Sequence, residues 1–257
     1  MQIDQALIAV VVGGASGMGA ATVEQLRAHG ATVAILDKNA DLGNALATRT
    51  GASFFPIDVM DESSVVAAFE AARHKQGQER VLVHTPGGGG LGAIAWREPQ
   101  GGALRRHDFA RFERIIKLNL NSTFLCASVA AQGMLGLPVG PEGDRGVIVL
   151  TSSVASVDCP AATGAYVAAK AGINGLTLSI ARDLASEAIR VNTILPGNFA
   201  TPLIKDVPEE YKANMRKWNL HPKRFGEGHE YASLALEIIR NGYFNAAQIR
   251  LDAGARI

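Results

Sequence analysis

Cysteine is scarce in this chain of 257 residues, which contains only Cys126 and Cys159. Two cysteines cannot form a disulfide framework, and no C-x-x-C pair or cluster of histidines and cysteines has the spacing of a zinc site. We therefore expect two reduced thiols, at least one of them buried, and no bound metal.

A net charge of either sign is missing as well. The 25 lysines and arginines nearly balance the 24 aspartates and glutamates, which leaves a formal charge of +1. Nucleic-acid-binding domains carry a basic stripe, so this balance argues against nucleic acid as the main partner. Apolar residues make up 47% of the chain, which is ordinary for a globular protein with a large core.

Long hydrophobic runs are also absent. The first apolar run, 7–12, is followed at once by glycines, so it is too short for a membrane span or a secretory signal. Only six residues precede it. We expect no membrane partner and a cytoplasmic location.

The chain does contain a regular alternation of strand and helix patterns. Continuous apolar runs rich in β-branched residues are typical of strands buried on both faces, and apolar spacings of three and four are typical of helices. Strands are expected at 7–12, 31–36, 52–57, 80–84, 147–151, 190–195 and 248–252. Helices are expected at 18–28, 41–49, 62–74, 109–134, 165–186 and 230–240. This alternation predicts an α/β fold, with one Rossmann-type domain over residues 1–257 and a doubly wound parallel sheet covered by helices on both faces.

Two long segments, about 86–107 and 197–228, interrupt the alternation. Loops this long in a compact domain are usually functional or mobile. Both follow the carboxyl ends of predicted strands, where ligands bind in such sheets. We interpret them as substrate loops.

A glycine-rich turn, Gly13-Gly14-Ala15-Ser16-Gly17-Met18-Gly19, joins the first predicted strand to the first predicted helix. Glycines there let the backbone approach a pyrophosphate, and the helix N-terminus offers N–H groups to it. A glycine-rich turn alone is a weak signal. Its place in a strand–helix–strand unit favours a dinucleotide site.

Asp37 ends the second predicted strand, where a carboxylate can accept hydrogen bonds from a ribose 2′-hydroxyl and would repel a 2′-phosphate. This favours NAD over NADP, although the neighbouring Lys38 could partly serve a phosphate. Asp58 follows the third predicted strand and either bonds an adenine amino group or caps the next turn.

Tyr166 and Lys170 stand four residues apart on a predicted helix and therefore share one face. A free tyrosine has a pKa of about 10, and a nearby cation favours its phenolate. We expect Lys170 to bring the pKa of Tyr166 towards the working range of a general acid and base.

With the glycine turn, Asp37 and this pair in order, the chain resembles the short-chain dehydrogenase/reductase family along essentially its whole length. Gly13, Gly17 and Gly19 match the spacing of the family's cofactor loop. The family has an active-site serine 13 residues before the tyrosine, and Ser153 occupies that position here. The family's helix asparagine matches Asn119. The resemblance implies a catalytic set of Asn119, Ser153, Tyr166 and Lys170.

The resemblance also extends the candidate cofactor site beyond the turn and Asp37. The full set is Gly13, Ser16, Gly17, Met18, Gly19, Asp37, Asp58, Val59, Thr85, Gly87, Tyr166, Lys170, Pro196, Gly197, Phe199 and Thr201. The chain departs from the family at His84-Thr85-Pro86-Gly87, where Asn-Asn-Ala-Gly is common. Gly87 keeps close approach to the cofactor possible, Pro86 lacks an N–H, and we interpret His84 as structural.

The resemblance implies reversible hydride transfer between a secondary alcohol and NAD. Tyr166 would take the hydroxyl proton, Ser153 would orient the substrate oxygen, and Lys170 would also hold the nicotinamide ribose. Asn119 would anchor a water that links Lys170 to solvent. The resemblance also implies a homotetramer, the usual assembly of the family, whose interface would be formed by the helices 109–134 and 165–186.

Segments 180–184, 196–203 and 249–252 resemble most the type 2 3-hydroxyacyl-CoA dehydrogenase branch, which implies a 3-hydroxyacyl-CoA substrate. Six cations in the second loop (Lys205, Lys212, Arg216, Lys217, Lys223 and Arg224) either attract such a phosphorylated carrier or form a solvated helix face. The alternatives are a 3-oxoacyl-carrier-protein reductase, which Asp37 disfavours, and an aryl, cyclic or steroid alcohol dehydrogenase. A non-catalytic nucleotide-binding scaffold would be expected to lack part of the catalytic set, and all four residues are present.

Overall fold

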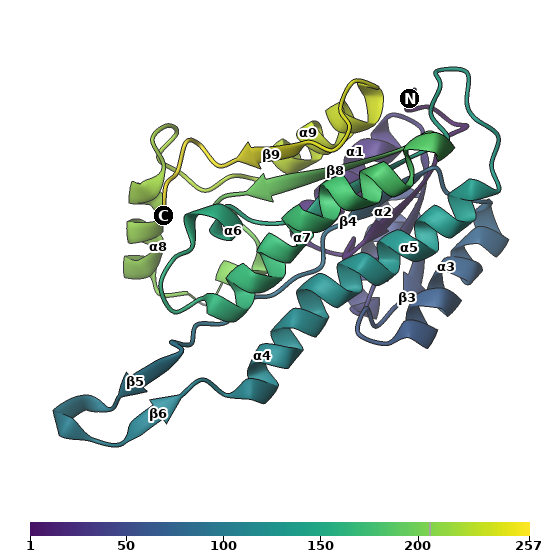
Figure 1. Cartoon of the computed structure of the whole chain (residues 1–257). Coiled ribbons are helices and arrows are strands. Elements are labelled where there is room, and N and C mark those ends of the chain that lie inside the picture. Colours follow the sequence, from purple (N-terminus) through teal and green to yellow (C-terminus); the bar gives the residue numbers. More distant parts are fainter. Residues whose placement is uncertain (206) are drawn as a thin grey trace.

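In the computed structural model, which describes residues 1–205 and 207–257, seven parallel strands form one sheet between two layers of helices (Figure 1). The strand order is β3-β2-β1-β4-β7-β8-β9. The strands are β1 (Ile8–Val12), β2 (Thr32–Asp37), β3 (Ser53–Pro56), β4 (Val81–His84), β7 (Gly146–Thr151), β8 (Ile189–Pro196) and β9 (Gln248–Leu251). The predicted α/β sheet is confirmed, and each strand end lies within one residue of its expected position.

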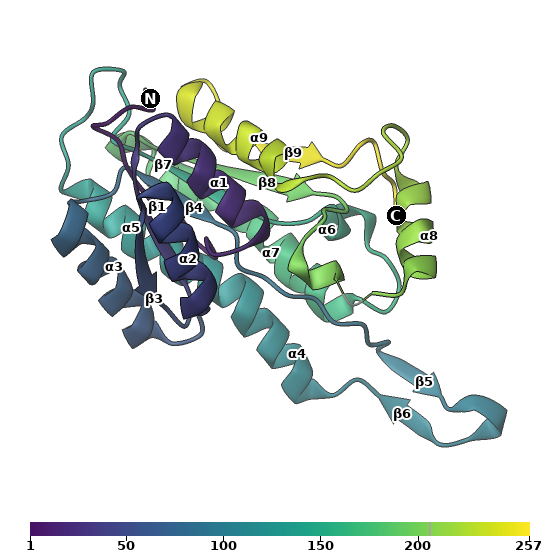
Figure 2. The ribbon, with the colours of Figure 1, turned by 180° about the vertical axis from the view of Figure 1, so that it is seen from behind.

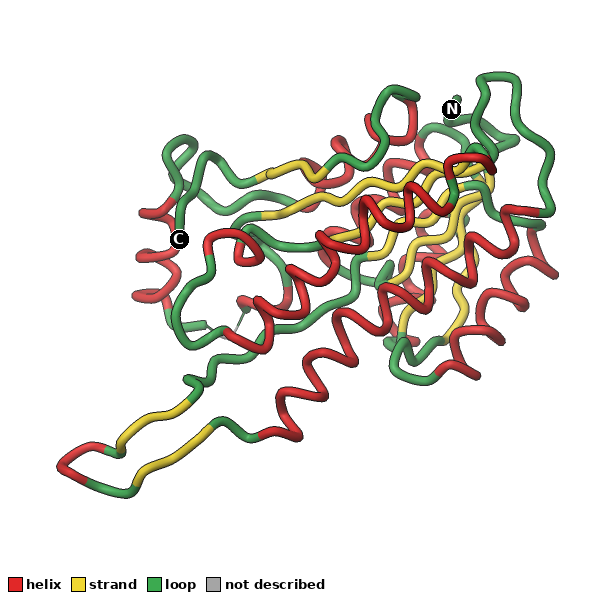
Figure 3. The backbone as a smooth tube through the Cα atoms, viewed as in Figure 1, coloured by secondary structure: helices red, strands yellow, loops and turns green. Residues whose placement is uncertain are grey.

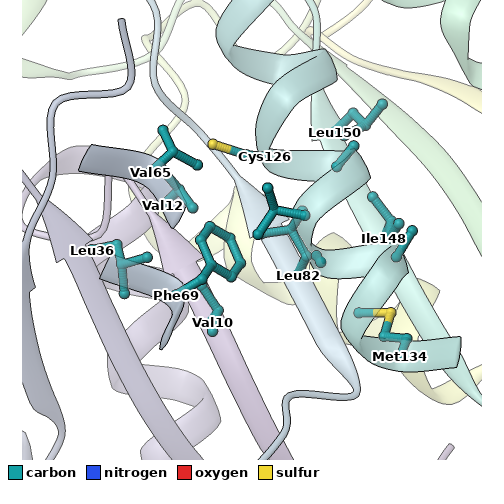
Figure 4. Close-up of a cluster of buried hydrophobic side chains, with 14 of the residues drawn as sticks. Val10, Val12, Leu36, Val65, Phe69, Leu82, Cys126, Met134, Ile148 and Leu150 are labelled. Carbon is teal, nitrogen blue, oxygen red and sulfur yellow. The ribbon is translucent and has the colours of Figure 1, made fainter. Parts of the chain in front are cut away.

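The sheet has a separate hydrophobic core on each face, because successive side chains of a strand point to opposite sides. Helices α1 (Gly17–Ala28), α2 (Ala40–Thr50) and α9 (Gly228–Arg240) cover one face (Figure 2). Helices α3 (Glu62–Gln76), α5 (Ser122–Leu135) and α7 (Gly164–Asp183) cover the other. In β1, Val10 and Val12 belong to the second core, where Phe69 and Met134 reach in from α3 and α5 (Figure 4).

The strand order reverses direction between β1 and β4, which lie side by side in the centre of the sheet. The loop after β1 leads to α1 on one face, and the loop after β4 leads to helices on the other. Such a switch point opens a crevice at the carboxyl ends of the strands. The glycine turn and the segment His84–Gly87 therefore meet at this crevice.

The single helix expected over 109–134 is interrupted. It consists of α4 (Phe109–Ile116), a π-helical turn over Lys117–Asn121, and α5. The hydroxyls of Ser122 and Thr123 donate to the carbonyls of Leu118 and Asn119, each at 2.6 Å, so side chains satisfy carbonyls at the turn. Apolar periodicity continues through the turn, which is why the sequence predicted one helix.

The two predicted substrate loops contain short elements that the sequence did not predict. The first loop carries a hairpin of β5 (Ala95–Arg97) and β6 (Leu104–Arg106) with the 3₁₀ turn η1 (Pro99–Gly101), which projects beyond the body (Figure 3). The second contains η4 (Pro202–Ile204) and α8 (Glu209–Trp218), and α6 (Ala155–Asp158) and η3 (Ala185–Glu187) lie elsewhere. The hairpin strands and α8 bury no residue, so they lack the apolar pattern that would reveal them.

The two thiols differ in environment. Cys126 is buried in α5, and burial raises the pKa of its thiol to about 12, whereas Cys159 is exposed after α6. The expectation of at least one buried cysteine is confirmed. Among the described residues, no helix has both the length and the apolar character needed to cross a membrane.

Candidate active site

A cleft of about 430 Å³ lies at the carboxyl ends of β1, β2 and β4. The candidate cofactor residues that line it are Gly13, Ser16, Gly17, Met18, Gly19, Asp37, Asp58, Val59, Thr85, Gly87 and Thr201. The lining residues that sequence reasoning missed are Leu36, Lys38 (considered there only as a counterargument to NAD), Ile57, Met60, Pro86, Leu118 and Pro202. Most of them stand next to a residue that the sequence did indicate, and no other feature of the sequence singles them out.

The glycine turn needs glycine for both conformation and space. Gly13 and Gly17 have φ values of +72° and +54°, in the left-handed region. A Cβ on Gly13 would lie 2.7 Å from Thr85 Oγ1. That hydroxyl donates to the carbonyls of Val12 (2.9 Å) and Gly13 (3.1 Å), so Thr85 ties the turn to the end of β4. The backbone thus forms a cradle that fits a pyrophosphate at the N-terminus of α1.

Asp37 lines the cleft at the end of β2, and the backbone holds its carboxylate. One oxygen accepts from the N–H of Ala15 at 3.0 Å, and the other accepts from the N–H of Asn39 at 2.9 Å. These bonds fix the carboxylate beside the glycine turn. Asp58 also lines the cleft, but its Oδ1 accepts from the N–H of Met60, which is the turn-capping geometry.

The structure does not bring Pro196, Gly197 and Phe199 into this cleft. Pro196 ends β8, and Phe199 is only 7% exposed and pairs with Gly226 through an isolated bridge. A Cβ on Gly197 would lie 2.8 Å from Asp252 Cα, so Gly197 allows close packing against the C-terminal segment. Of this segment, Thr201 reaches the cleft, near Gly17.

Lys170 is buried where α7 crosses the end of β7. Its Nζ donates to the carbonyl of Thr151 at 3.0 Å, and its own carbonyl accepts from the hydroxyl of Ser152 at 2.8 Å. Burial disfavours the charged amine and lowers the pKa of Lys170 to about 7. Ser153, which follows Ser152, accepts a hydrogen bond at its Oγ from the N–H of Ala155 at 3.2 Å, so its hydroxyl proton remains available to another partner.

Tyr166 lies one helical turn before Lys170, whose Nζ is 5.7 Å from the centre of the phenol ring. Burial raises the pKa of Tyr166 above its usual value, and an interaction with the Ser153 hydroxyl opposes the rise. The expected lowering of this pKa by Lys170 is wrong for the protein by itself. Desolvation is the dominant effect, and the Lys170 amine is directed to the Thr151 carbonyl.

Asn119 and Lys170 approach each other on either side of Gly87. A Cβ on Gly87 would lie 2.9 Å from Asn119 Oδ1 and 3.1 Å from Lys170 Nζ. The Asn119 amide donates to the carbonyls of Gly88 (2.8 Å) and Ile115 (2.9 Å), and its Oδ1 accepts from the N–H of Gly88 (3.2 Å). Asn119 therefore joins the π-helical turn to the loop after β4, beside the lysine.

Five of the six loop cations have hydrogen-bond partners for their side chains among the described residues, which bears on the two interpretations left open by the sequence. The contacts of their side chains are Arg216 with Glu209, Arg224 with Glu230, Lys217 with Asn214, Lys212 with the Lys205 carbonyl, and Lys223 with the carbonyls of Lys217 and Asn219. Most of these charges serve the loop itself. The solvated-face interpretation accounts for them, and they give little support to a phosphate-binding rim.

Comparisons with known proteins identify the family of the chain. A family model described as short chain dehydrogenase matches residues 7–212. The chain is 40% identical to a 3-hydroxyacyl-CoA dehydrogenase type-2 from Bos taurus, covering 98% of this chain and 95% of the relative. It is 34% identical to a 2,5-dichloro-2,5-cyclohexadiene-1,4-diol dehydrogenase from Sphingobium indicum, covering 90% and 88%. The crystal structure of a 3-hydroxyacyl-CoA dehydrogenase type-2 from Mycobacterium avium, 40% identical, superposes with a TM-score of 0.88 and coverages of 98% and 96%.

The chain belongs to the short-chain dehydrogenase family and is an oxidoreductase. Members of this family generally use a nicotinamide cofactor, which the cleft with its glycine cradle and Asp37 fits. The resemblance expected from the sequence, including the type 2 branch, is confirmed.

Replacing Gly87 by alanine should separate Asn119 from Lys170, because the added methyl group would contact both. We expect Gly87→Ala to lower kcat about tenfold or more, since small misplacements of reacting groups are costly. Gly175→Ala is the matched control, because a Cβ on Gly175 in α7 has no neighbour within 4 Å. Steady-state kinetics of both variants would decide it, and equal activities would contradict the close approach at Gly87.

Proposed function

We propose that this enzyme interconverts a 3-hydroxyacyl-CoA and a 3-oxoacyl-CoA with NAD as its cofactor. The observation that carries the proposal is a contact set beside the cleft: Asn119 and Lys170 flank Gly87, which lines the cleft, and Tyr166 interacts with Lys170 and Ser153. The similarity to 3-hydroxyacyl-CoA dehydrogenases type-2 over nearly the whole chain supports the substrate class.

Bound NAD would supply the acceptor for the hydride of the alcohol carbon. Ser153 would donate its hydroxyl proton to the substrate oxygen and orient it. Tyr166, whose pKa lies above its usual value, is a neutral phenol in the protein by itself and suits the acid role in ketone reduction. In alcohol oxidation it must first lose that proton.

Lys170 would act as the nearby proton acceptor and donor. With a pKa of about 7, its amine changes charge near neutral pH, so a proton can enter or leave the buried site at modest cost. Asn119 lies beside this amine and bonds the loop at Gly88, and in this proposal a water near Asn119 would link the amine to solvent.

Asp37 supports NAD over NADP, because two backbone N–H groups hold its carboxylate in the wall of the cleft, where it could accept hydrogen bonds from a ribose 2′-hydroxyl. Lys38 lines the same cleft and carries the opposite charge.

Asp37→Asn should therefore reduce the preference for NAD, because it keeps the shape of the side chain and removes the charge. We expect the ratio of kcat/KM for NAD over NADP to fall about 10- to 100-fold, the range for loss of a charged hydrogen bond. Lys38→Ala, the control, should leave that ratio at or above the wild-type value. An unchanged ratio in Asp37→Asn would refute the assignment.

The substrate class has one competitor with its own support. The similarity to a cyclohexadiene-diol dehydrogenase, and the internal partners of the loop cations, favour a cyclic secondary alcohol without a phosphorylated carrier. The greater identity to the hydroxyacyl-CoA enzymes leads us to prefer the thioester.

Initial rates with NAD on 3-hydroxybutyryl-CoA, a hydroxysteroid and a 1-arylethanol would test the choice. We expect the highest kcat/KM for the thioester.

Tyr166→Phe should lose about 10²- to 10⁴-fold in kcat, the usual contribution of a general acid and base, with NADH binding by fluorescence titration unchanged. A higher kcat/KM for either other alcohol would overturn the substrate class, and an active Tyr166→Phe would overturn the mechanism.

We also propose a homotetramer, which exposed apolar side chains support. Phe109 on α4, Phe124 on α5 and Leu178 on α7 are 61%, 54% and 43% exposed. Contiguous exposed apolar surface is typical of interfaces, and these three side chains stand on the helices expected to form one. Light scattering at four times the chain mass would support the assembly, and a monomer would contradict it. The cytoplasmic location stays a prediction.

A further inference from the structure

His84 is a fully buried polar residue in the centre of the sheet, next to the site. It ends β4, paired with Val12 of β1 on one side and Leu150 of β7 on the other. Burial and the charge of Lys170 lower the pKa of His84 to about 3, so the imidazole is neutral at any ordinary working pH.

The contacts of the imidazole define its tautomer. His84 Nδ1 lies 3.3 Å from Thr123 Oγ1, and that hydroxyl also lies 2.6 Å from the carbonyl of Asn119. A hydroxyl has one proton, and the carbonyl can only accept, so the threonine proton goes to Asn119. Thr123 Oγ1 therefore accepts from Nδ1–H, which leaves Nε2 as the bare nitrogen. Nε2 is buried and has no hydrogen-bond partner among the described residues.

This chain of bonds ends at the π-helical turn. Thr123 holds the main chain of Asn119, whose side chain meets Gly88 and approaches Lys170 across Gly87. A π-helical turn is a less regular conformation than the helices on either side. The imidazole reaches it from a different, rigid element, the central strand β4.

We propose that His84 is a positioning residue, whose Nδ1–H fixes Thr123 and thereby the π-helical turn that places Asn119 beside Lys170. The inference rests on the proposed role of Asn119 and Lys170 in moving a proton. It gives a function to a residue that differs from the asparagine common in the family and that is not among the residues lining the cleft.

Amide side chains can separate the two nitrogens of the imidazole. The amide nitrogen of asparagine comes near the position of Nδ1, whereas the glutamine amide extends to that of Nε2. His84→Gln and Thr123→Val should therefore each lower kcat about tenfold, the effect of one lost hydrogen bond, with KM for NAD unchanged. His84→Asn and Thr123→Ser, the conservative variants, should retain most of kcat.

The double variant His84→Gln/Thr123→Val should be no slower than the slower single variant, because both changes break one chain of bonds. Hydrogen exchange of the amides of 117–123, measured without nucleotide, should rise in His84→Gln and Thr123→Val and stay low in the two conservative variants.

The proposal is overturned if His84→Asn falls as far as His84→Gln, if the two single losses multiply in the double variant, or if exchange in 117–123 does not change. The proposed function fails in a different way: the wild-type enzyme would then not oxidise the thioester, while the exchange results could still follow the expected pattern.

Discussion

The contact on which the site depends is the hydrogen bond from the buried ammonium of Lys170 to the carbonyl of Thr151. An amine removed from water favours its neutral form unless it has partners, and this one has a single carbonyl within bonding distance among the described residues. Its pKa falls to about 7 for that reason. The lysine is thereby poised to change charge, which an exposed lysine at neutral pH is not.

The surrounding residues keep this arrangement in place. Gly87 lets the amine and Asn119 approach, because any side chain there would contact both. Ser152 ties the backbone of α7 to the end of β7, so the lysine enters from a fixed direction. The hydrogen bonds that run from His84 through Thr123 connect the π-helical turn to the central strand β4. Helix α7 and the end of β7 supply Lys170 and Ser152, and the irregular turn supplies Asn119.

Much of the fold and part of the site could be predicted because they depend on local pattern. The strands are continuous apolar runs, and the spacing of Tyr166 and Lys170 places both on one helix face. The π-helical turn could not be predicted, because it depends on the hydroxyls of Ser122 and Thr123, which bond carbonyls of their own helix, and on His84 from strand β4. The raised pKa of Tyr166 depends on burial by segments distant in the sequence. The pairing of the loop cations depends on partners such as Glu209 and Glu230, which the fold brings near them.

The titration of Lys170 tests the central claim most directly. Proton–carbon correlation spectra of the full-length protein with ¹³C-labelled lysine, recorded without nucleotide, would follow each amine with pH, and Lys170→Arg would assign its signal. The account predicts one lysine titrating near pH 7, as burial implies. A Lys170 signal that titrates at about 10.4, the value of an exposed lysine, would contradict it.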